Sequence, residues 1–507
     1  MKRIFIVFIS LICFFPAFSQ EKLGIANSNY SSTNSIFLNP SSSVDSRTLM
    51  QLNLVGANIY LMNNVAYLPK FRAWANSSAE YQDPKLSTIG LKKFVDTKVE
   101  INGPAFVLSN REIGVGFFIR GRVEGSVDNI PMDLVNLALQ KNFDSISKNM
   151  NINLRNTRVS QMAWVEYGLN FGKMYFKHGN TIIEAGGNAK YLTGIGLAYA
   201  NIYQLKAHID NSEADIENFR ARVRYNEPGW NTGKGAGIDL GVTYKKTIDY
   251  VDTYFSNSQK SNCKHIDYKY KLGVSLLDVG AIRFNTNTFK GDVSGSDTIT
   301  NFKHGNVDSL IRYDFNVTQQ KNTPIWACLP TALSVQAEWN MGHHFYVNGT
   351  VIQGLTVARI VGVQRTNLLS IAPRYERTNF ELAIPVTLHR YIYPQVGLAF
   401  RIRTFVFGMD NVLPLIVKNN TYGVNVYFNV GISLFKNPAC KVSRPRFIAP
   451  KVKYEGYTFL SLKGRSKKKI AANGQGVAPE TTISSKGGKK SKKKKHFRIR
   501  FRKSKKL

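Results

Sequence analysis

The chain has 507 residues, a net charge of +35 and four cysteines. The charge is uneven, because the stretch from Lys436 to the end holds 24 lysines and arginines against two glutamates, so +22 lies there and the rest is only mildly basic. Four cysteines without a CxxC pair are too few for a disulfide framework and do not have the spacing of a zinc site. A disulfide-stapled small domain is therefore excluded, and a cysteine-ligated metal site has little support.

Residues 1–19 have the layout of a secretory signal peptide. The positive start MKR is followed by the apolar stretch IFIVFISLICFFPAF and by small residues up to Ser19. The stretch is too short to span a bilayer as a helix. Cys13 lies inside it and follows no small-residue pair, which argues against lipidation. We expect cleavage before Gln20 and export, which excludes nucleic acid as the ordinary partner of the basic tail.

Strand-like alternation recurs along residues 51–435. In GVGFFIRGRV, Val115 and Phe117 fall on one face, and Arg120 and Arg122 fall on the other. Segments of this period and length are typical of membrane-crossing strands, which need about 9–11 residues each. The fold class predicted is all-β, a transmembrane antiparallel β-barrel of about 14 strands. The expected strands are 51–64, 97–108, 113–126, 157–172, 181–203, 234–250, 266–285, 328–340, 343–355, 367–376, 378–388, 394–401, 403–410 and 421–435.

The segment ahead of these strands, residues 20–50, is rich in serine and asparagine and has almost no apolar face. It cannot form a lipid-facing strand, since such a strand presents apolar side chains to the acyl chains. We expect it to fold inside the barrel as an N-terminal plug.

The connections between the expected strands alternate between long and short. Tight turns are expected at SNRE, at MGHH and around Glu376 and Arg377, and only 251–265 is too long for this side. This phase predicts an outer-membrane barrel with both termini periplasmic. PMDLVNLALQKNFDSISKNM predicts a helix inside one long loop. The long connections are 65–96, 127–156, 204–233 and 286–327.

The end of the chain forms a separate segment. Phe435 closes the last expected strand, and we expect it to be the terminal aromatic residue that barrel-insertion machinery reads, although strand propensity alone also accounts for it. Residues 436–507 are expected to be a largely disordered, basic periplasmic extension. In HFRIRFRKSKKL, an extended backbone would separate an apolar edge from a cationic edge. We expect residues 486–507 to tether the barrel to a periplasmic protein, to peptidoglycan or to an anionic membrane surface. The alternative, an incidental disordered tail, stays open. The candidate partner-binding residues are Phe497, Arg498, Ile499, Arg500, Phe501 and Arg502.

Three cysteines remain after the signal peptide. In the expected topology Cys263 and Cys440 lie on the periplasmic side and Cys328 lies near the outer rim. If any disulfide forms, it is expected to join the first two, and closing so long a loop would stabilise the fold.

Enzymatic motifs are missing from the sequence. There is no HExxH, GxSxG or P-loop, and the glycine cluster GKGAG at 233–237 opens a strand without the helix that phosphate binding needs. His343 and His344 share a tight turn and have no further ligand nearby in sequence. We expect no catalytic residues, no metal and no cofactor. A catalytic group assembled across strands stays open, because sequence spacing does not reveal it.

Several charged and amide residues lie on the polar faces of the expected strands. Such side chains either brace and solvate a barrel interior or line a transport path, and the sequence does not separate the two. The lumen-facing candidates are Arg120, Arg122, Glu166, Gln336 and Glu338.

The order of four segments resembles a known family. GIANSNYSSTNSIFLNPSSSVDSR, SLLDVGAIRF, LPTALSVQAEW and FGMDN resemble a group of Bacteroidota outer-membrane barrels of unknown function. That group is similar to long-chain fatty-acid transporter barrels and to barrel subunits of the type IX secretion system. Asn39 and Pro40 match the Asn-Pro-Ala-like motif of the N-terminal hatch in those barrels, with Ser41 in place of the alanine. The resemblance covers roughly residues 23–440 and implies fourteen strands and a plug.

Two functions fit these observations. The first is a non-enzymatic outer-membrane barrel that acts as a scaffold or component of a cell-envelope complex. The second is a channel for small hydrophobic molecules, similar to the fatty-acid transporters. The basic tail favours the scaffold, since a transporter has no evident need of it, and outer-membrane lipid is expected to surround the barrel in either case.

Overall fold

The computed structural model describes residues 21–71, 84–90, 92–110, 112–132, 135, 150–210, 213–248, 250, 267–299, 316–355, 361–413 and 419–434. The expected signal peptide and the tail from Lys436, including Phe497–Arg502, lie outside the described residues, as do Phe435, Cys263, Cys440 and most of the helix expected near Pro131.

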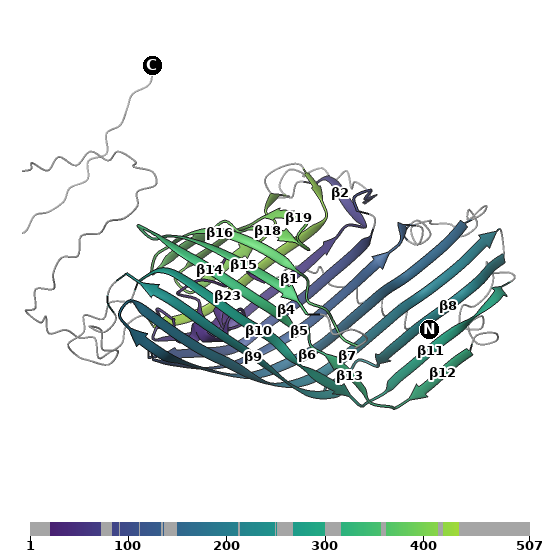
Figure 1. The fold of residues 1–507 in the computed structure, drawn as a ribbon, viewed down its shortest axis with the longest axis horizontal. Coiled ribbons are helices and arrows are strands. Elements are labelled where there is room, and N and C mark those ends of the chain that lie inside the picture. Colours follow the sequence, from purple (N-terminus) through teal and green to yellow (C-terminus); the bar gives the residue numbers. More distant parts are fainter. Residues whose placement is uncertain are drawn as a thin grey trace, which may run out of the picture. The chain divides into compact units, whose positions relative to one another are not determined.

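Fourteen strand passes form one antiparallel wall (Figure 1). Three passes are each split into two short strands, and Pro330, Pro385 and Gly397 lie at the breaks, where proline removes a ladder donor and glycine weakens a strand. The wall consists of β1 (Met50–Asn63), β4 (Lys93–Ser109), β5 (Ile113–Ile130), β6 (Met150–His178), β7 (Thr181–Asp210), β9 (Gly233–Thr247), β10 (Tyr268–Phe284), β13 (Ile325–Cys328) with β14 (Ala332–Gly342), β15 (Phe345–Gly354), β16 (Leu368–Glu376), β17 (Phe380–Ala383) with β18 (Val386–His389), β19 (Tyr393–Val396) with β20 (Leu398–Ile402), β21 (Phe405–Met409) and β23 (Gly423–Leu434).

The wall closes through its first strand. β1 pairs with β4 on one side and with β23 on the other, so that Leu52 lies opposite both Phe106 and Ile432. Closure lets the backbone donors and acceptors of the wall pair within the protein, which is required of strands in lipid. Each of the fourteen strands expected from the sequence corresponds to one pass, and the predicted fold class is confirmed.

The wall is apolar outside and polar inside. On β14, Val335 and Trp339 are 41% and 56% exposed, whereas Ser334 and Glu338 are 0% and 4% exposed. A water-soluble protein buries its apolar face instead, so this wall is built to face lipid. Exposed apolar side chains recur on the outer face at Leu54, Ile101, Val115, Leu169, Tyr191, Leu240, Val274, Ile371, Leu382, Leu398 and Ile432.

Aromatic side chains gather at the rim that carries the short turns. The rings of Tyr244 and Tyr270 are 6.2 Å apart, and those of Tyr270 and Trp339 are 6.3 Å apart. The ring centres of Phe345 and Tyr375, on the next two strands, are 5.0 Å apart. Aromatic rows of this kind are found where a barrel passes from hydrocarbon to headgroups.

The turns follow the expected phase with one exception on each side. The tight connections predicted at SNRE, MGHH and Glu376 are all present, and in the second His343 and His344 adopt φ of 51° and 72°, the backbone of a two-residue hairpin. The connection 248–267 is the long one on this side. On the other side the connection 390–392 is short, as the interval between the expected strands 378–388 and 394–401 implies, although it breaks the alternation of long and short connections.

β6 and β7 run on past the rest of the wall (Figure 1). Beyond Gly194, where β7 stops pairing with β9, it pairs with β8 (Glu213–Asn226), which pairs with β11 (Thr288–Ile299), which pairs with β12 (Asn316–Lys321). We call this extension the projecting sheet. The expectation that 204–233 and 286–327 are loops is therefore wrong. In β8 the stretch ENFRARVRYN alternates arginine with small and apolar residues as a strand does, but it lies between two expected wall strands and was interpreted as part of a long connection.

Short elements complete the described chain. β2 (Ala66–Phe71), β3 (Lys85–Leu86) and β22 (Asn419–Thr421) form a small separate sheet, and ahead of β1 lie the single-turn helices α2 (Ser32–Ser35) and η1 (Pro40–Ser43). Among the described residues no helix is long and apolar enough to cross a membrane.

The apolar outer face makes a testable prediction. Leu240→Arg, at a 51%-exposed site in the middle of β9, is expected to lower the free energy of unfolding by about 2–4 kcal/mol, because it places a charge in hydrocarbon. Urea unfolding in lipid vesicles, followed by tryptophan fluorescence, measures it. Thr318→Arg on the exposed β12 is the control and should change stability by about 0.5 kcal/mol or less. Equal effects at the two sites would show that β9 does not face lipid.

Candidate functional site

Residues 21–49, the plug segment, lie inside the barrel ahead of β1 (Figure 1). Most of them are buried and none is exposed, although most are polar. They form tight turns and no strand, because serine and asparagine side chains compete for backbone groups, as when Ser35 Oγ donates to the Ser31 carbonyl at 3.0 Å. The lumen therefore contains a folded piece of the same chain.

Inward-facing glycines make room for η1. A Cβ added at Gly186 would lie 2.8 Å from the Pro40 carbonyl oxygen, and one at Gly172 would lie 2.7 Å from Ser43 Oγ, both too close for an ordinary contact. Glycine in a strand interior often marks a place where another backbone approaches. Five successive wall strands contribute to this glycine seat, at Gly114, Gly172, Gly186, Gly241 and Gly273.

Asn39 caps η1 and joins it to the wall. Its Oδ1 accepts hydrogen bonds from the backbone N–H of Ser41 at 3.1 Å and from the Ser41 hydroxyl at 2.7 Å. Its Nδ2 donates to Gln336 Oε1 at 3.1 Å and to Thr243 Oγ1 at 3.3 Å. Pro40 occupies the first position of η1, where its missing N–H has no cost. The structure thus brings together Asn39, Pro40 and Gln336, three of the residues selected from the sequence.

Three other selected residues meet in the middle of the lumen. Glu166 accepts from Arg120 Nη2 at 2.6 Å and from Arg122 Nη1 at 2.8 Å. Arg122 Nη1 also donates to Asp278 Oδ1 at 2.9 Å, and Lys190 Nζ donates to the same oxygen at 2.6 Å. All five residues are buried.

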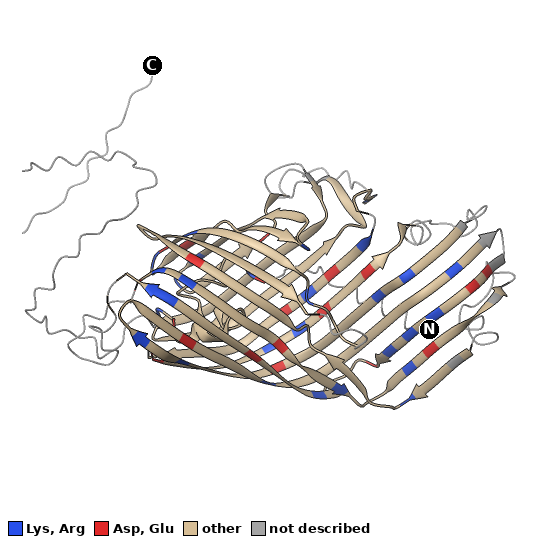
Figure 2. Cartoon of the chain, in the orientation of Figure 1, with Lys and Arg blue, Asp and Glu red and all other residues tan. Residues whose placement is uncertain are grey.

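This network, the central charge layer, crosses the lumen. Lys22 of the plug segment lies 3.1 Å from Glu100, and Lys98 lies 3.1 Å from Glu21. Figure 2 shows the acidic and basic positions interspersed on the wall strands. Opposite charges are equal in number, which a bracing network needs and a charge-selective pore does not. The layer comprises Lys22, Lys98, Arg120, Arg122, Lys190 and Arg365 with Glu21, Glu100, Glu124, Glu166, Asp239 and Asp278.

Glu338 belongs to a second network, nearer the short turns. It lies 3.2 Å from Arg374 Nη2 and accepts a short hydrogen bond from Tyr268. Arg374 also lies 3.0 Å from Glu376, which accepts from Asn29 Nδ2 at 2.9 Å. The plug segment is thus held at two levels of the lumen, and the structure does not bring Glu338 to Arg120, Arg122 or Glu166.

Asp45 latches the end of the plug segment to the wall. Its carboxylate lies 2.6 Å from Lys245 Nζ and 3.4 Å from Lys271 Nζ. Burial alone would raise the pKa of Asp45, but the two lysines outweigh burial and lower the pKa to about 2.

The lowered pKa gives the latch a defined pH range. A carboxylate whose pKa falls on folding stabilises the folded state above its unfolded pKa, so the contribution of Asp45, on the order of 2 kcal/mol, is complete near pH 7 and is lost between about pH 4 and pH 2. We expect Asp45→Asn to be less stable than the native protein by about this amount at pH 7, measured by urea unfolding in detergent. The gap should shrink as the pH falls from 4 to 2. A gap that stays constant over this range would contradict the latch.

The connection between β15 and β16, on the side of the barrel that carries the long connections, also enters the lumen. Arg365, between β15 and β16, lies 2.6 Å from Glu21 and 2.8 Å from Asp278. The carbonyl of Val361 accepts from the backbone N–H of Cys328 at 2.9 Å, and Val363 packs into the mouth cluster. The mouth cluster is a fully buried apolar group comprising Met162, Trp164, Leu192, Leu197, Ile282, Phe284, Ile325, Ala327, Leu329 and Val363.

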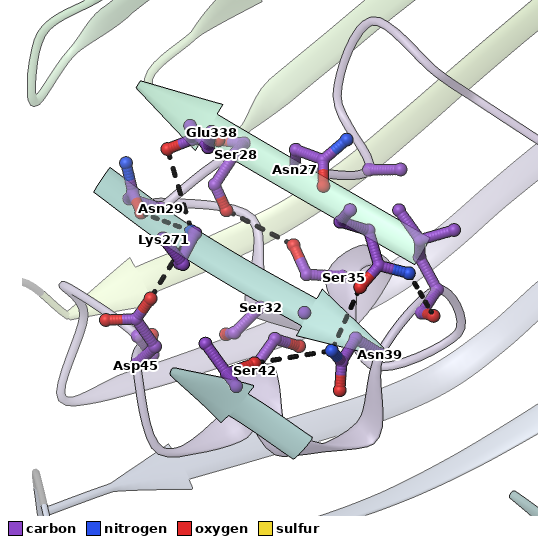
Figure 3. Close-up of a pocket in the computed structure, with 16 residues that line it drawn as sticks. Asn27, Ser28, Asn29, Ser32, Ser35, Asn39, Ser42, Asp45, Lys271 and Glu338 are labelled. Atoms are coloured by element: carbon purple, nitrogen blue, oxygen red, sulfur yellow. Dashed lines mark hydrogen bonds and ion pairs between the residues drawn. The ribbon is translucent and has the colours of Figure 1, made fainter. Parts of the chain in front are cut away.

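A small cavity remains between the plug segment and strands β9, β10 and β14. Its volume is about 40 Å³, and Figure 3 shows Lys271 joined to Asn29, Asp45 and Glu338 at its edge. A polar space of this size suits a few ordered waters. Ligand pockets usually measure about 300–1,000 Å³, so this cavity does not hold a hydrocarbon.

The described residues offer no metal site. No group of three or more histidine, cysteine, aspartate or glutamate side chains within them is placed to hold an ion. His343 and His344 form the expected turn at the rim, and Cys328, at the end of β13, is a free thiol.

A family model described as a family of unknown function, DUF5723, matches residues 40–410. The chain belongs to this family. No curated protein matches. Three solved structures are similar in fold. A deltaS2S3 mutant of the TodX monoaromatic hydrocarbon channel is 9% identical, with 80% of this chain and 95% of that chain covered and a TM-score of 0.41. The Pseudomonas putida toluene transporter TodX is 11% identical, with 83% of this chain and 100% of that chain covered and a TM-score of 0.39, and the Ralstonia pickettii toluene transporter TbuX is 8% identical, with 79% of this chain and 93% of that chain covered and a TM-score of 0.37.

The region matched by DUF5723 starts at Pro40, inside the capped turn, and includes the wall glycines that receive it. Several functional side chains in this region were missed from the sequence. Asp278 is the clearest case, because it lies in the bulge between Leu276 and Val279, where alternation counted from Leu272 points it outward. Arg365 was missed because it lies in a loop. Lys190 and Arg374 do lie on polar strand faces, and strand parity could have found them.

Proposed function

We propose that this chain is an outer-membrane barrel that acts as a non-enzymatic scaffold or component of an envelope complex. The observation that carries the proposal is the filling of the lumen by described parts of the chain. The plug segment and the loop at Arg365 meet in the central charge layer, and a cavity beside the plug, lined mainly by serine, asparagine and charged residues, measures about 40 Å³. A barrel with a filled lumen still offers its outer wall, its rims and the projecting sheet as surfaces on which other envelope components can bind.

The membrane placement rests on the outer face of the wall. Its apolar band and the aromatic row of Tyr244, Tyr270 and Trp339 suit hydrocarbon and interface, while the projecting sheet carries exposed ion pairs such as Arg222 with Asp292 and so belongs in water. We place the projecting sheet outside the cell and both chain ends in the periplasm. Cysteine labelling of intact cells should then reach Thr318→Cys and spare Arg377→Cys, and the reverse pattern would refute this orientation.

The tail extends the scaffold proposal. Residues 486–507 combine clustered lysines with the alternating Phe497–Arg502 segment. In the periplasm they would tether the barrel to a protein, to peptidoglycan or to an anionic membrane surface, since each cation near such a surface is worth on the order of 1 kcal/mol.

A second candidate is a gated channel for small hydrophobic molecules, as the resemblance to fatty-acid transporters suggested. The mouth cluster favours it, because apolar side chains such as Trp164 and Phe284 line the lumen above the charge layer, and Val363 enters on a loop rather than on a wall strand. Displacement of that loop would open an apolar chamber.

One experiment separates the two candidates. The full chain and a variant lacking 486–507 are purified from native membranes after crosslinking, and the full chain is also tested in proteoliposomes for uptake of radiolabelled toluene and palmitate. The scaffold proposal expects a stoichiometric crosslinked partner that is lost with the tail at moderate salt, and uptake no faster than in empty vesicles. Saturable uptake with no tail-dependent partner would favour the channel and overturn the scaffold.

A further inference from the structure

A basic patch interrupts the outer face of the wall at the end from which the projecting sheet emerges. Arg283 on β10 lies directly opposite Lys234 on β9 and opposite Trp326 on β13. All three residues are exposed, and the Arg283 guanidinium lies 5.9 Å from the centre of the Trp326 ring. We call these three residues the outer basic patch.

The patch lies at the edge of the apolar band. The outward column of β9 runs from Lys234 through Ile238, Leu240 and Val242, which are 44%, 51% and 49% exposed, to Lys246. The two lysines are 12 positions apart, which is roughly 40 Å along a strand and about 28 Å across a membrane at a 45° tilt. A hydrocarbon core is about 30 Å thick, so the lysines mark its two surfaces.

The cations of the patch have no acidic partner among the described residues. Neither Lys234 nor Arg283 lies within ion-pair distance of a described carboxylate, whereas on the nearby projecting sheet Arg222 and Arg224 both pair with Asp292. Trp230, 70% exposed, lies in the turn that leads into β9. Two cations without an acidic partner in the described part of the chain, beside the exposed indole of Trp326, fit an anion that brings its own apolar part.

We propose that the outer basic patch binds the phosphorylated headgroup of an outer-leaflet lipid. Arg283 and Lys234 donate charge-assisted hydrogen bonds to phosphate oxygens, Trp326 packs at the interface, and the acyl chains lie along the apolar column below Lys234. The proposal rests on the membrane placement given above and adds to it the chemistry of a lipid partner at one defined site.

The test uses purified, delipidated barrel in detergent, with bisphosphorylated lipid A as the probe and native mass spectrometry as the readout. Lys234→Gln/Arg283→Gln is expected to weaken binding about thirtyfold, since each cation near an anionic headgroup is worth about a factor of five. Lys246→Gln/Arg377→Gln, the same charge change at the opposite rim, should leave binding unchanged. Heat-modifiable gel migration verifies that both variants are folded.

Three results would overturn the proposal: equal affinity in the native protein and in the patch variant, equal loss in the two double variants, or displacement of the probe by millimolar inorganic phosphate. The last would mean a phosphate site rather than a lipid site. Because binding is measured in detergent, it is independent of the cysteine labelling that tests orientation and of the uptake assay that tests the scaffold. Failure of the lipid site and failure of the proposed function are therefore distinguishable.

Discussion

Asp278→Asn is expected to lower the free energy of unfolding of the barrel by about 3–5 kcal/mol, the usual cost of removing one partner from a buried ion network. Asp278 lies 2.9 Å from Arg122, 2.6 Å from Lys190 and 2.8 Å from Arg365, so its loss leaves three buried cations short of charge. Its backbone φ is 54°, a conformation that asparagine also adopts readily, so the substitution removes charge with little change in shape. Urea unfolding in lipid vesicles gives the value.

The matched control is Asp292→Asn on the projecting sheet. Asp292 also faces two arginines, Arg222 at 3.1 Å and Arg224 at 2.8 Å, but its side chain is 50% exposed. Exposed pairs contribute about 0–1 kcal/mol, so the change should be small. Equal losses for Asp278→Asn and Asp292→Asn would show that the central charge layer is not sealed from water.

Gly186→Val is expected to unseat the plug segment and open the barrel to small solutes. The new Cβ would lie 2.8 Å from the Pro40 carbonyl and 2.9 Å from Ser41 Cα, both backbone atoms that cannot rotate away. Overpacking of this kind costs about 1–3 kcal/mol, which shifts the ratio of seated to unseated plug by about five- to 150-fold. Influx of a small sugar into proteoliposomes, measured by swelling, reports the open fraction, and deletion of 21–48 gives the reference without a plug.

Gly187→Val is the control for the seat. It is the next residue of β7, its side chain would face outward, and its nearest wall atom is 3.1 Å away, within the same β-ladder. Valine also suits a lipid-facing strand position. We expect this variant to stay closed. Leakage through both variants, or through neither, would argue against the glycine seat as the support of the plug.

The wall could be predicted from the sequence because lipid imposes one rule on every strand. An outward residue such as Val335 must be apolar and a neighbour such as Gln336 is free to be polar, so period-two alternation locates all fourteen passes. The projecting sheet obeys no such rule. β8 has solvent rather than hydrocarbon beside it, and its alternation of arginine with small and apolar residues was interpreted as a loop.

The site could be predicted only in part, for a geometric reason. The alternation of residues along each strand selected Arg120, Arg122 and Glu166, and these three do meet. The alternation shows which face a residue is on but not its height along the barrel axis. Glu338 was therefore grouped with residues that lie in another layer. The glycine seat depends on five strands that are adjacent only after folding. The role of a single glycine such as Gly241 cannot be inferred from the sequence, because it depends on the contact with Asn39 in the folded barrel.

The glycine seat has a consequence for the order of assembly. The plug segment precedes β1, yet it rests on β5, β6, β7, β9 and β10, and the wall closes only when β1 meets β23 at the far end of the chain. Pairing two strands that are separated by most of the wall is slow, because the chain loses conformational entropy before the new contacts stabilise it. We therefore expect the plug segment to reach its seat before the seam between β1 and β23 forms, so that the last strand pair encloses it.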